Sequence, residues 1–454
     1  MSFLRNLIYL LLLAAVSPWL LYQAWRNGKY RAGWNEKFFG RVPRRHGDRR
    51  CIWFHAVSVG EVNLLRPLIA RWEQEFPDWD CVISTTTRTG FELAHQRYAP
   101  RTVFYAPLDF SWAVDRALRR IQPDLLVMAE LEVWPNWIAA AKTRNIPVAI
   151  INGRLSAKSF QGYQRLRRLL QPTFAQLAAV GVQNEEYAER FRQMGVPAER
   201  VQTTGSIKFE DANIDRQNPQ TRRLAALAGI GANDRVFLAG STQETEEATA
   251  LAAYDALRAE HPQLRLILVP RHPERFDAVA ELLTNRGVKF QRRSQLEKHG
   301  ANNDARVLLV DVVGELGAWW GTAHIAFVGG SLTQRGGQNM IEPAAYGAAV
   351  CFGPNTWNFK DVVELLLGNN AAVVVRNEAE LTAFVRKALA EPDFATNIGQ
   401  RARELVIAQT GAADKTLRLL ANCIPKPPET PTLPPPTPKL MTRISFPPRN
   451  AQAG

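Results

Sequence analysis

Short apolar runs that alternate with segments of helical period are the feature of this sequence that most constrains its fold. In the first half of the chain the runs are IWFH, CVIS, TVFY, LLVMA, VAII, AVGV and VQTT, at residues 52–55, 81–84, 102–105, 125–129, 148–151, 179–182 and 201–204. Continuous apolar strands that alternate with helices are typical of a parallel sheet covered by helices on both faces. The first half is therefore predicted to be one doubly wound α/β domain.

A second series of runs begins after a polar segment. That segment, EDANIDRQNPQTRR at residues 210–223, is broken by Pro219 and suits a linker. The runs beyond it are VFLAG, LILV, VLLV, IAFVG, AVCF and AVVV, at residues 236–240, 266–269, 307–310, 325–329, 349–352 and 372–375. We predict a second doubly wound domain and a cleft between the two. A single closed barrel is disfavoured, because about thirteen strands exceed the eight of that fold.

The first residues predict a membrane anchor. Residues 7–25 carry no charge and are about long enough to cross a hydrocarbon core. Residues 26–50 then hold nine Lys and Arg against Glu36 and Asp48, a bias that places the following domains in the cytoplasm and the basic segment on anionic lipid. A cleaved signal peptide is the alternative, but it would need basic residues before the apolar run and a small-residue cleavage site. The anchor either spans the bilayer or dips into it at Pro18.

These patterns predict the domain boundaries. An anchor at 1–26 is followed by the basic juxtamembrane segment 27–50, an N-terminal domain at 51–212, a C-terminal domain at 213–423 and a tail at 424–454. Ten of the 31 tail residues are proline, so we expect the tail to be disordered or polyproline-like.

Charge and cysteine usage narrow the classes of partner. The net charge of +13 favours acidic partners such as phosphates, anionic lipid or nucleic acid, without choosing among them. The four cysteines are scattered without C-x-x-C spacing, which argues against a disulfide framework or a zinc site and favours a reducing compartment. No metal cluster is predicted elsewhere.

Polar residues that directly follow the apolar runs form the candidate site. Ligands of parallel α/β sheets bind outside the carboxyl ends of the strands. In the first half, Glu61, Glu130 and Lys208 occupy such positions. Glu61 has a structural alternative, since an acid after Gly60 at a helix start is favoured by the helix dipole. Its place after the first strand, facing the cleft, instead indicates a general base for a hydroxyl acceptor.

The second half offers an anion site at the corresponding strand ends. In residues 329–347, GGSLTQRGGQNMIEPAAYG, four glycines let the backbone approach a ligand, and a helix that begins near Asn339 would direct its amides at an anion. The segment is neither a Walker loop nor a G-x-G-x-x-G motif. The spacing of Asn339 and Glu342 also fits a simple capping box. Arg271 follows another strand, where its guanidinium suits a phosphate.

Eight segments in this order resemble the Kdo transferases, which add 3-deoxy-D-manno-octulosonic acid (Kdo) to the lipid A precursor of lipopolysaccharide. They are FHAVSVGE (54–61), MAELEVWPN (128–136), NGRLS (152–156), QNEE (183–186), TGSIKF (204–209), LVPRHPERF (268–276), GEL (314–316) and FVGGSLTQRGGQNMIEP (327–343). The resemblance runs from the anchor to about residue 420 and implies a GT-B fold, with two Rossmann-like domains that bind acceptor and donor.

The resemblance also implies roles for individual residues. Glu61 matches the proton acceptor, and Glu130 with Lys208 matches the pair that stabilises the transition state. The residues that match the CMP-binding segments are Pro270, Arg271, Gly314, Glu315, Leu316, Asn339, Met340, Ile341 and Glu342. The implied reaction is inverting and metal-independent, uses CMP-Kdo and no cofactor, and takes place at the inner membrane. No nucleic-acid partner is expected.

The chain departs from the family pattern at three positions. Gln243 and Gln338 stand where the family usually has His, and Thr245 replaces a usual Gly. Glutamine donates hydrogen bonds but carries no charge, which puts donor-phosphate contacts near these positions in doubt. Two other functions stay open: a GT-B transferase that uses a UDP-sugar, and a non-catalytic protein that binds lipid or nucleic acid through a degenerate cleft.

Overall fold

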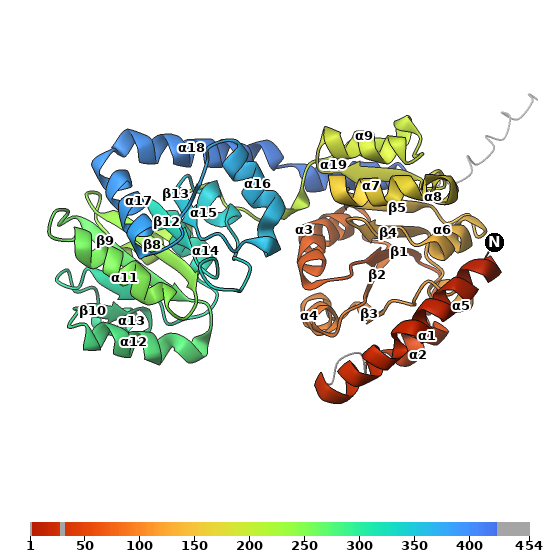
Figure 1. Ribbon diagram of the computed structural model, residues 1–454, viewed down its shortest axis with the longest axis horizontal. Coiled ribbons are helices and arrows are strands. Elements are labelled where there is room, and N and C mark those ends of the chain that lie inside the picture. The colour runs from red at the N-terminus through yellow and green to blue at the C-terminus, as the bar shows by residue number, and fades with distance from the viewer. Residues whose placement is uncertain (1, 28–31, 425–454) are drawn as a thin grey trace, which may run out of the picture.

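The chain folds into two α/β domains, each built on a parallel sheet (Figure 1). The computed structural model describes residues 2–27 and 32–424. The tail predicted to be disordered or polyproline-like, residues 424–454, lies outside the described residues except for Ile424. The GT-B fold class predicted above, two doubly wound domains preceded by an apolar N-terminal helix, is confirmed.

The first sheet has the strand order β3-β2-β1-β4-β5-β6-β7. Its strands are β1 (Arg50–His55), β2 (Trp79–Thr85), β3 (Thr102–Tyr105), β4 (Leu125–Ala129), β5 (Val148–Gly153), β6 (Ala179–Val182) and β7 (Val201–Thr203). Alternate residues of β1 enter opposite cores: Ile52 and Phe54 lie in one, Cys51 and Trp53 in the other. Burial on both faces explains why the strands are continuously apolar.

Helices cover both faces of this sheet. They are α1 (Ser2–Asn27), α2 (Trp34–Phe39), α3 (Val59–Glu75), α4 (Arg88–Tyr98), α5 (Ser111–Ile121), α6 (Pro135–Lys142), α7 (Ala157–Arg165), α8 (Arg167–Phe174) and α9 (Glu185–Gln193), with the 3₁₀ turns η1 (Ala198–Arg200) and η2 (Ile207–Phe209). Val42 lies in the core beside α5, so part of the predicted juxtamembrane segment belongs to this domain.

The second sheet has the order β10-β11-β9-β8-β12-β13-β14. Its strands are β8 (Arg235–Thr242), β9 (Leu264–Pro270), β10 (Phe290–Arg292), β11 (Val307–Leu309), β12 (Ile325–Val328), β13 (Ala349–Phe352) and β14 (Val373–Val374). The sequence runs anticipate six of them. The seventh, β10, is a three-residue edge strand of sequence FQR, too short and too polar to register as an apolar run.

The remaining helices pack on the second sheet, apart from the last. They are α10 (Pro219–Leu227), α11 (Glu246–Leu257), α12 (Phe276–Asn285), α13 (Arg293–His299), α14 (Leu316–Trp319), α15 (Ile341–Ala345), α16 (Lys360–Gly368), α17 (Glu378–Ala390), α18 (Pro392–Gln409) and α19 (Ala412–Ala421), with η3 (Pro273–Arg275), η4 (Trp320–Thr322) and η5 (Trp357–Phe359).

Helix α19 returns to the first domain. Leu417 and Leu420 lie in the same core as Ile52 and α3, and Figure 1 shows α19 within the N-terminal domain. Arg71 of α3 pairs with Asp414 at 3.0 Å. These residues are predicted above to belong to the C-terminal domain, 213–423. The structure differs because the apolar face of α19 completes a core that α3 and α4 leave open.

The switch points of the two sheets locate the ligand-binding edges. Strand order reverses between β1 and β4 in the first sheet and between β8 and β12 in the second. In open α/β sheets a ligand binds in the crevice at that point, outside the carboxyl ends of the two strands. Glu61 and Glu130 follow β1 and β4, and the Gly329–Gly330 turn follows β12.

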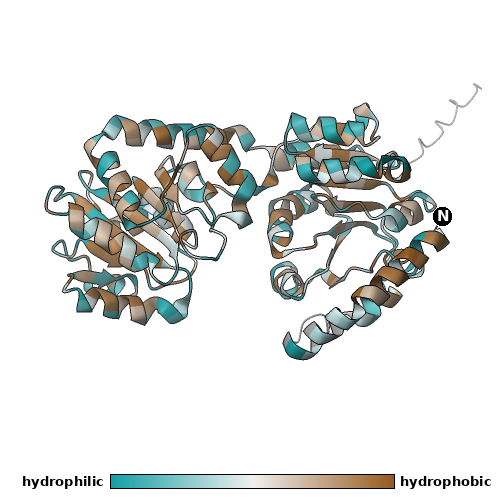
Figure 2. Ribbon diagram, viewed as in Figure 1, coloured by the Kyte–Doolittle hydropathy of each residue, from teal (hydrophilic) through white to brown (hydrophobic). Residues whose placement is uncertain are grey.

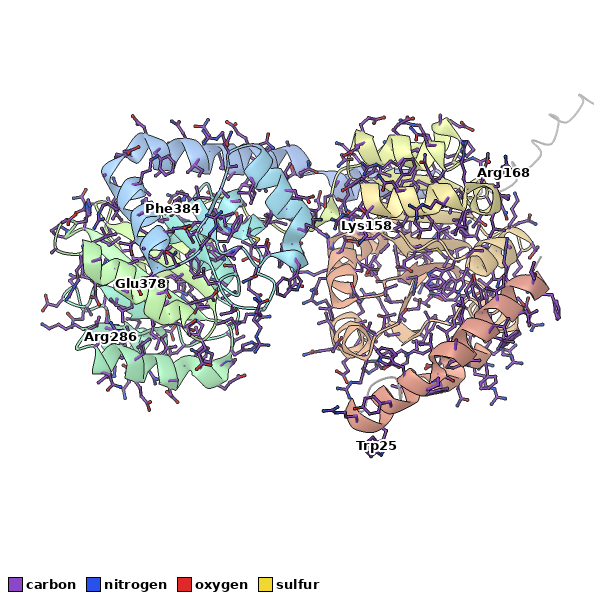
Figure 3. The ribbon with its side chains drawn as sticks, in the orientation of Figure 1. Trp25, Lys158, Arg168, Arg286, Glu378 and Phe384 are labelled. Atoms are coloured by element: carbon purple, nitrogen blue, oxygen red, sulfur yellow. The ribbon has the colours of Figure 1, made fainter. Side chains whose placement is uncertain are left out.

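Helix α1 is long and apolar enough to cross a membrane over Ser2–Trp19, which is compatible with a membrane anchor. Figure 2 shows its apolar character concentrated toward the N-terminus, and Figure 3 places Trp25 at its far end. The helix is also docked on the first domain. Asn6 Nδ2 donates to Ser111 Oγ at 2.7 Å, and Tyr9 OH donates to Asp109 Oδ2 at 2.9 Å.

Asp109 joins α1 to the start of α6. Its buried carboxylate accepts the backbone N–H groups of Asn136 and Trp137, both at 3.0 Å, besides the Tyr9 hydroxyl. The residue before α6, Trp134, supplies no side-chain cap of its own. Asp109 therefore satisfies amides that a helix start leaves without partners.

We predict that Asp109→Ala lowers the free energy of unfolding by about 3 kcal/mol, because two backbone donors and a tyrosine hydroxyl lose a buried acceptor. Chemical denaturation of the first domain, followed by tryptophan fluorescence, measures the change. Asp78→Ala is the matched control, since Asp78 is exposed in a turn; its effect should stay within about 0.5 kcal/mol. Equal effects of the two substitutions would contradict the role given to Asp109.

Candidate active site

Glu61 is held in a fixed position at the start of α3. Ser58 is the N-cap, and its hydroxyl accepts the Glu61 N–H and donates to Glu61 Oε1 at 2.9 Å. Glu61 Oε2 accepts the Val57 N–H at 2.8 Å. This is close to a capping box, so the structural alternative for Glu61 is real. The same contacts fix the carboxylate at the carboxyl end of β1, so capping and chemistry are compatible roles.

Burial decides the acidity of Glu61. It raises the pKa of Glu61 to about 7, and the Glu130 carboxylate acts in the same direction, while the Val57 N–H, the Ser58 hydroxyl and Lys208 lower it. A helix start by itself would lower the pKa of an acid. Desolvation outweighs that effect, because the side chain lies almost completely inside the domain. A carboxylate with this pKa is suited to accept a proton near neutral pH.

Glu130 turns away from its strand through a left-handed backbone. Its φ is 58°, a region that non-glycine residues seldom occupy, and its N–H still pairs with Ile151 O of β5 at 2.9 Å. Its Oε1 lies 3.2 Å from Lys208 Nζ. The structure therefore brings together two of the three residues predicted for catalysis, and the third, Glu61, is electrostatically coupled to both.

Lys208 reaches the site because its loop is tied down from two sides. Asn152, at φ 53° near the end of β5, accepts the Ile207 N–H on Oδ1 at 3.0 Å. On the other side, Gln409 Oε1 of α18 accepts the Ser206 N–H at 3.2 Å. The short turn η2 thus projects Lys208 toward Glu130 although β7 is the far edge strand of the sheet.

Three further charged residues belong to this cluster and were given no role by the sequence. Burial and the nearby Glu61 carboxylate raise the pKa of Glu132 to about 7, while the Trp134 indole donates to it at 2.7 Å. Asp361 of α16 accepts from Lys208 at 3.0 Å, and Arg154 lies 3.8 Å from the same carboxylate. Glu132 and Arg154 lie inside the segments MAELEVWPN and NGRLS, which resemble the family, and that position could have identified them as site residues. Nothing in the sequence indicated Asp361.

The predicted donor-binding segments converge at the carboxyl ends of β8 and β9. A Cβ on Gly240 would overlap with Trp320 and lie 3.0 Å from Leu316, so glycine lets α14 approach β8. Arg271, exposed after β9, donates its N–H to Thr242 O at 3.0 Å. The carboxylate of Glu342 lies near Gly317, since a Cβ there would be 3.8 Å from Oε2. The segments 270–271, 314–316 and 339–342 therefore border one region.

Several polar side chains in that region already have partners. Glu315 binds Arg293 through two hydrogen bonds of 2.8 and 2.7 Å. Asn339 donates to Glu342 Oε1 at 2.9 Å and accepts the Ile341 N–H at 3.0 Å, while the N-cap position of the five-residue helix α15 is Met340. Burial raises the pKa of Glu342, and the Asn339 amide opposes that shift. Asn339 and Glu342 thus contact each other through their side chains and do not form the capping box that their spacing suggests.

The carboxylate of Glu246 binds the backbone N–H groups of the glycine-rich loop, at residues 330–332. Glu246, fully buried at the start of α11, accepts the N–H groups of Gly330, Ser331 and Leu332 at 2.7 to 3.0 Å and that of Gln243 at 2.8 Å. The glycines here are predicted above to let the backbone approach a ligand. The amides of residues 330–332 are bound by Glu246, which fixes the path of this part of the loop.

The departures from the family pattern have visible consequences. Thr245 adopts φ 77°, where a β-branched residue is strained and glycine is not, which explains the usual glycine at this position. Gln243 is buried beside Glu246. Gln338 lies against Gly330, where a Cβ would be 3.3 Å from its Nε2.

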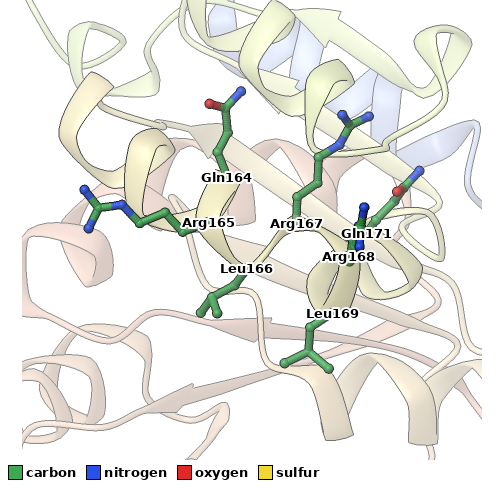
Figure 4. A pocket seen from close by; sticks show the side chains of 7 residues that line it. All are labelled: Gln164, Arg165, Leu166, Arg167, Arg168, Leu169 and Gln171. Carbon is green, nitrogen blue, oxygen red and sulfur yellow. The ribbon is translucent and has the colours of Figure 1, made fainter.

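A separate surface hollow of about 720 Å³ lies where α7 meets α8 (Figure 4). Its lining is Gln164, Arg165, Leu166, Arg167, Arg168, Leu169 and Gln171. None of these residues was predicted for the site. Across residues 2–27 and 32–424, no group of three or more His, Cys, Asp or Glu side chains has the arrangement to hold a metal ion.

The two sheets, each with its switch point at the carboxyl ends of its strands, give the chain the GT-B fold. A crystal structure of a glycosyltransferase from Rickettsia africae ESF-5 shares the fold, with a TM-score of 0.51 at 13% identity over 83% of this chain and 99% of that one. Residues 32–211 match the family model described as 3-Deoxy-D-manno-octulosonic-acid transferase (kdotransferase).

Curated relatives extend the match to most of the chain. The 3-deoxy-D-manno-octulosonic acid transferase of Haemophilus influenzae is 34% identical over 83% of this chain and 88% of its own length. That of Bordetella pertussis is 34% identical over 91% of this chain and 98% of its own. The chain belongs to the Kdo transferase family, which confirms the resemblance of the eight sequence segments and places the protein in lipopolysaccharide synthesis.

We predict that Glu246→Ala destabilises the C-terminal domain by at least about 3 kcal/mol, because four buried N–H groups lose their acceptor. Thermal and denaturant unfolding of the purified protein measure the effect. Glu244→Ala provides the control two residues away, where the side chain is 86% exposed, and should change stability by less than about 0.5 kcal/mol. A Glu246→Ala protein as stable as the control would show that the loop at residues 330–332 does not depend on this carboxylate.

Proposed function

We propose that this protein transfers Kdo from CMP-Kdo to the lipid A precursor lipid IVA, with inversion and without a metal ion. The observation that carries the proposal is the coupled cluster of Glu61, Glu130 and Lys208 at the end of the first sheet, opposite the convergent segments of the second. Family membership supports Kdo as the transferred sugar.

In this proposal Glu61 takes the proton from the acceptor hydroxyl. The hydroxyl oxygen then forms a bond to the anomeric carbon of Kdo, while the bond from that carbon to the phosphate oxygen of CMP breaks and its electron pair leaves with CMP. Attack on the face opposite the leaving group inverts the configuration at that carbon. Burial supports the role of Glu61, because its raised pKa makes the ionised carboxylate a stronger base than an exposed glutamate.

We assign to two cations of the cleft, Lys208 and Arg271, the stabilisation of the leaving group. Lys208, in contact with Glu130, and the exposed guanidinium of Arg271 supply fixed positive charge for the phosphate that departs with CMP. This charge supports a reaction that needs no metal ion. We assign CMP binding to residues 270–271, 314–316 and 339–342, in which backbone groups and the buried Asn339–Glu342 pair border one region.

We further propose that α1 anchors the enzyme at the inner membrane, with both domains on the cytoplasmic side. The apolar stretch Ser2–Trp19 and the basic residues that follow α1 support this arrangement, in which the basic residues contact anionic lipid. The lipid acceptor is then presented beside the N-terminal domain. Nucleic acid is not expected as a partner.

A donor panel tests the proposed substrates. Purified full-length protein in mixed micelles with lipid IVA should release CMP from CMP-Kdo, and mass spectrometry should show Kdo-bearing lipid. UDP-sugars should give no UDP release. Release of UDP with transfer of another sugar would favour the alternative GT-B donor. Salt-sensitive nucleic-acid binding without turnover of any donor would favour the non-catalytic alternative.

Substitution of Glu61 tests the proposed base. We predict that Glu61→Gln lowers kcat by at least about 10³-fold, because an amide cannot accept the hydroxyl proton. Glutamine still offers one oxygen and a donor to Ser58 and Val57, so circular dichroism and the thermal midpoint should stay close to wild type. Glu75→Gln is the matched control, exposed at the other end of α3, and should leave kcat unchanged. Near-normal transfer by Glu61→Gln would remove this residue from the mechanism.

A further inference from the structure

The ammonium group of Lys208 is shared between the two domains. Its Nζ lies 3.2 Å from Glu130 Oε1 in the N-terminal domain and 3.0 Å from Asp361 Oδ2 in the C-terminal domain. Arg154, also from the N-terminal domain, lies 3.8 Å from the other oxygen of Asp361. The Asp361 side chain is only 14% exposed. One acid from the donor-side domain thus enters a charge cluster that otherwise belongs to the acceptor-side domain.

The turn that precedes Asp361 is bound to the glycine-rich loop. Asp361 stands in the first turn of α16, which Figure 1 shows on the side of the C-terminal domain that faces the other domain. The turn before α16 is bound to the loop: Asn358 N–H donates to Gly336 O at 3.0 Å, and its side-chain amide donates to Arg335 O at 2.9 Å. A Cβ on Gly336 would overlap with Trp357, so the two segments pack without a gap.

The charges in the cluster balance. Two carboxylates, Glu130 and Asp361, face two cations, Lys208 and Arg154. Burial acts to lower the pKa of Lys208, but the two carboxylates more than offset it and hold the pKa above its ordinary value. Burial acts to raise the pKa of Asp361, and Lys208 with Arg154 reverses that, so both groups stay charged at neutral pH. A partly buried, doubly paired cluster fixes its members more firmly than a surface ion pair does.

We propose that Asp361 is a positioning residue, which holds the Lys208 ammonium in place for transfer and makes that placement depend on the glycine-rich loop of the opposite domain. The inference rests on the proposed function of Lys208. It gives the C-terminal domain a direct part in arranging the cluster around Glu130. A displacement of residues 335–337 would move α16, and with it the carboxylate that contacts Lys208.

Kinetics of Asp361→Asn test this role. We expect kcat for Kdo transfer to fall by at least about tenfold, since a hydrogen bond between charged groups is lost, while KM for the lipid acceptor stays within about twofold. Glu364→Gln, one turn further along α16, is the matched control. Its exposed pair with Lys360 should make no difference to either constant. Unchanged kcat in Asp361→Asn would overturn the proposal.

A double-mutant cycle separates positioning from general support of the domain interface. If Asp361 acts through Lys208, Asp361→Asn should change the residual kcat of Lys208→Gln, measured with enzyme in excess, by no more than about twofold. A full tenfold loss in that background would show that Asp361 acts independently of Lys208 and would contradict the inference. Should Asp361→Asn not fold, Asp361→Glu enters the same cycle. Its extra methylene displaces the carboxylate, so kcat should fall only when Lys208 is present.

Chemical labelling gives a readout that does not depend on Kdo transfer. Acetic anhydride modifies the neutral amine, so the rate of Lys208 acetylation, followed by peptide mass spectrometry against pH, reports the pKa of Lys208. Loss of the Asp361 charge should lower that pKa and speed acetylation by about threefold or more near pH 9; Glu364→Gln should not. Equal rates in the three proteins would refute the contact, whereas altered labelling in a protein without transferase activity would refute only the proposed function.

Discussion

Parallel pairing of β1 with β4, and of β8 with β12, creates the two sheet edges around which the site is built. These pairings bring the carboxyl ends of two central strands side by side in each sheet. Glu61 and Glu130 follow β1 and β4, and the end of β8 at Thr242 lies beside the Gly329–Gly330 turn that follows β12. Because both faces of each sheet are covered by core, a shift of a strand by one residue would exchange its side chains between two differently packed cores. The register therefore fixes which side chains reach the crevice.

Competing electrostatic effects within this frame set the chemistry of Glu61. The helix start and the two hydrogen bonds of its carboxylate favour the charged form, while burial and the Glu130 charge oppose it, and burial prevails. Glu132 experiences the same balance, with its pKa raised mainly by burial and by Glu61. The site thus holds two carboxyl groups that titrate near neutrality beside a Lys208 that stays charged.

The sequence predicts the features that recur along the chain, namely the buried strands and the polar residues that follow them. Apolar runs identify the buried strands, and the residues that follow them identify Glu61, Glu130 and Lys208, because strand ends of a parallel sheet share one edge. Strand β10 is not predicted, because an edge strand needs no apolar run. Helix α19 is assigned to the wrong domain, because its apolar face does not reveal which core it completes. Contacts between distant segments, such as Glu246 with the loop at 330–332 and Asp361 with Lys208, leave no local pattern at all.

The central claim is that burial converts a helix-capping glutamate into a base that works near neutral pH, and the pH dependence of single-turnover Kdo transfer tests it most directly. Because the reactive form is the ionised carboxylate, the rate should rise from about pH 5, pass an inflection near pH 7 and then level off, as the pKa of Glu61 requires. A rate that is already at its plateau at about pH 5 would show an ordinary, unshifted carboxylate and would contradict the account.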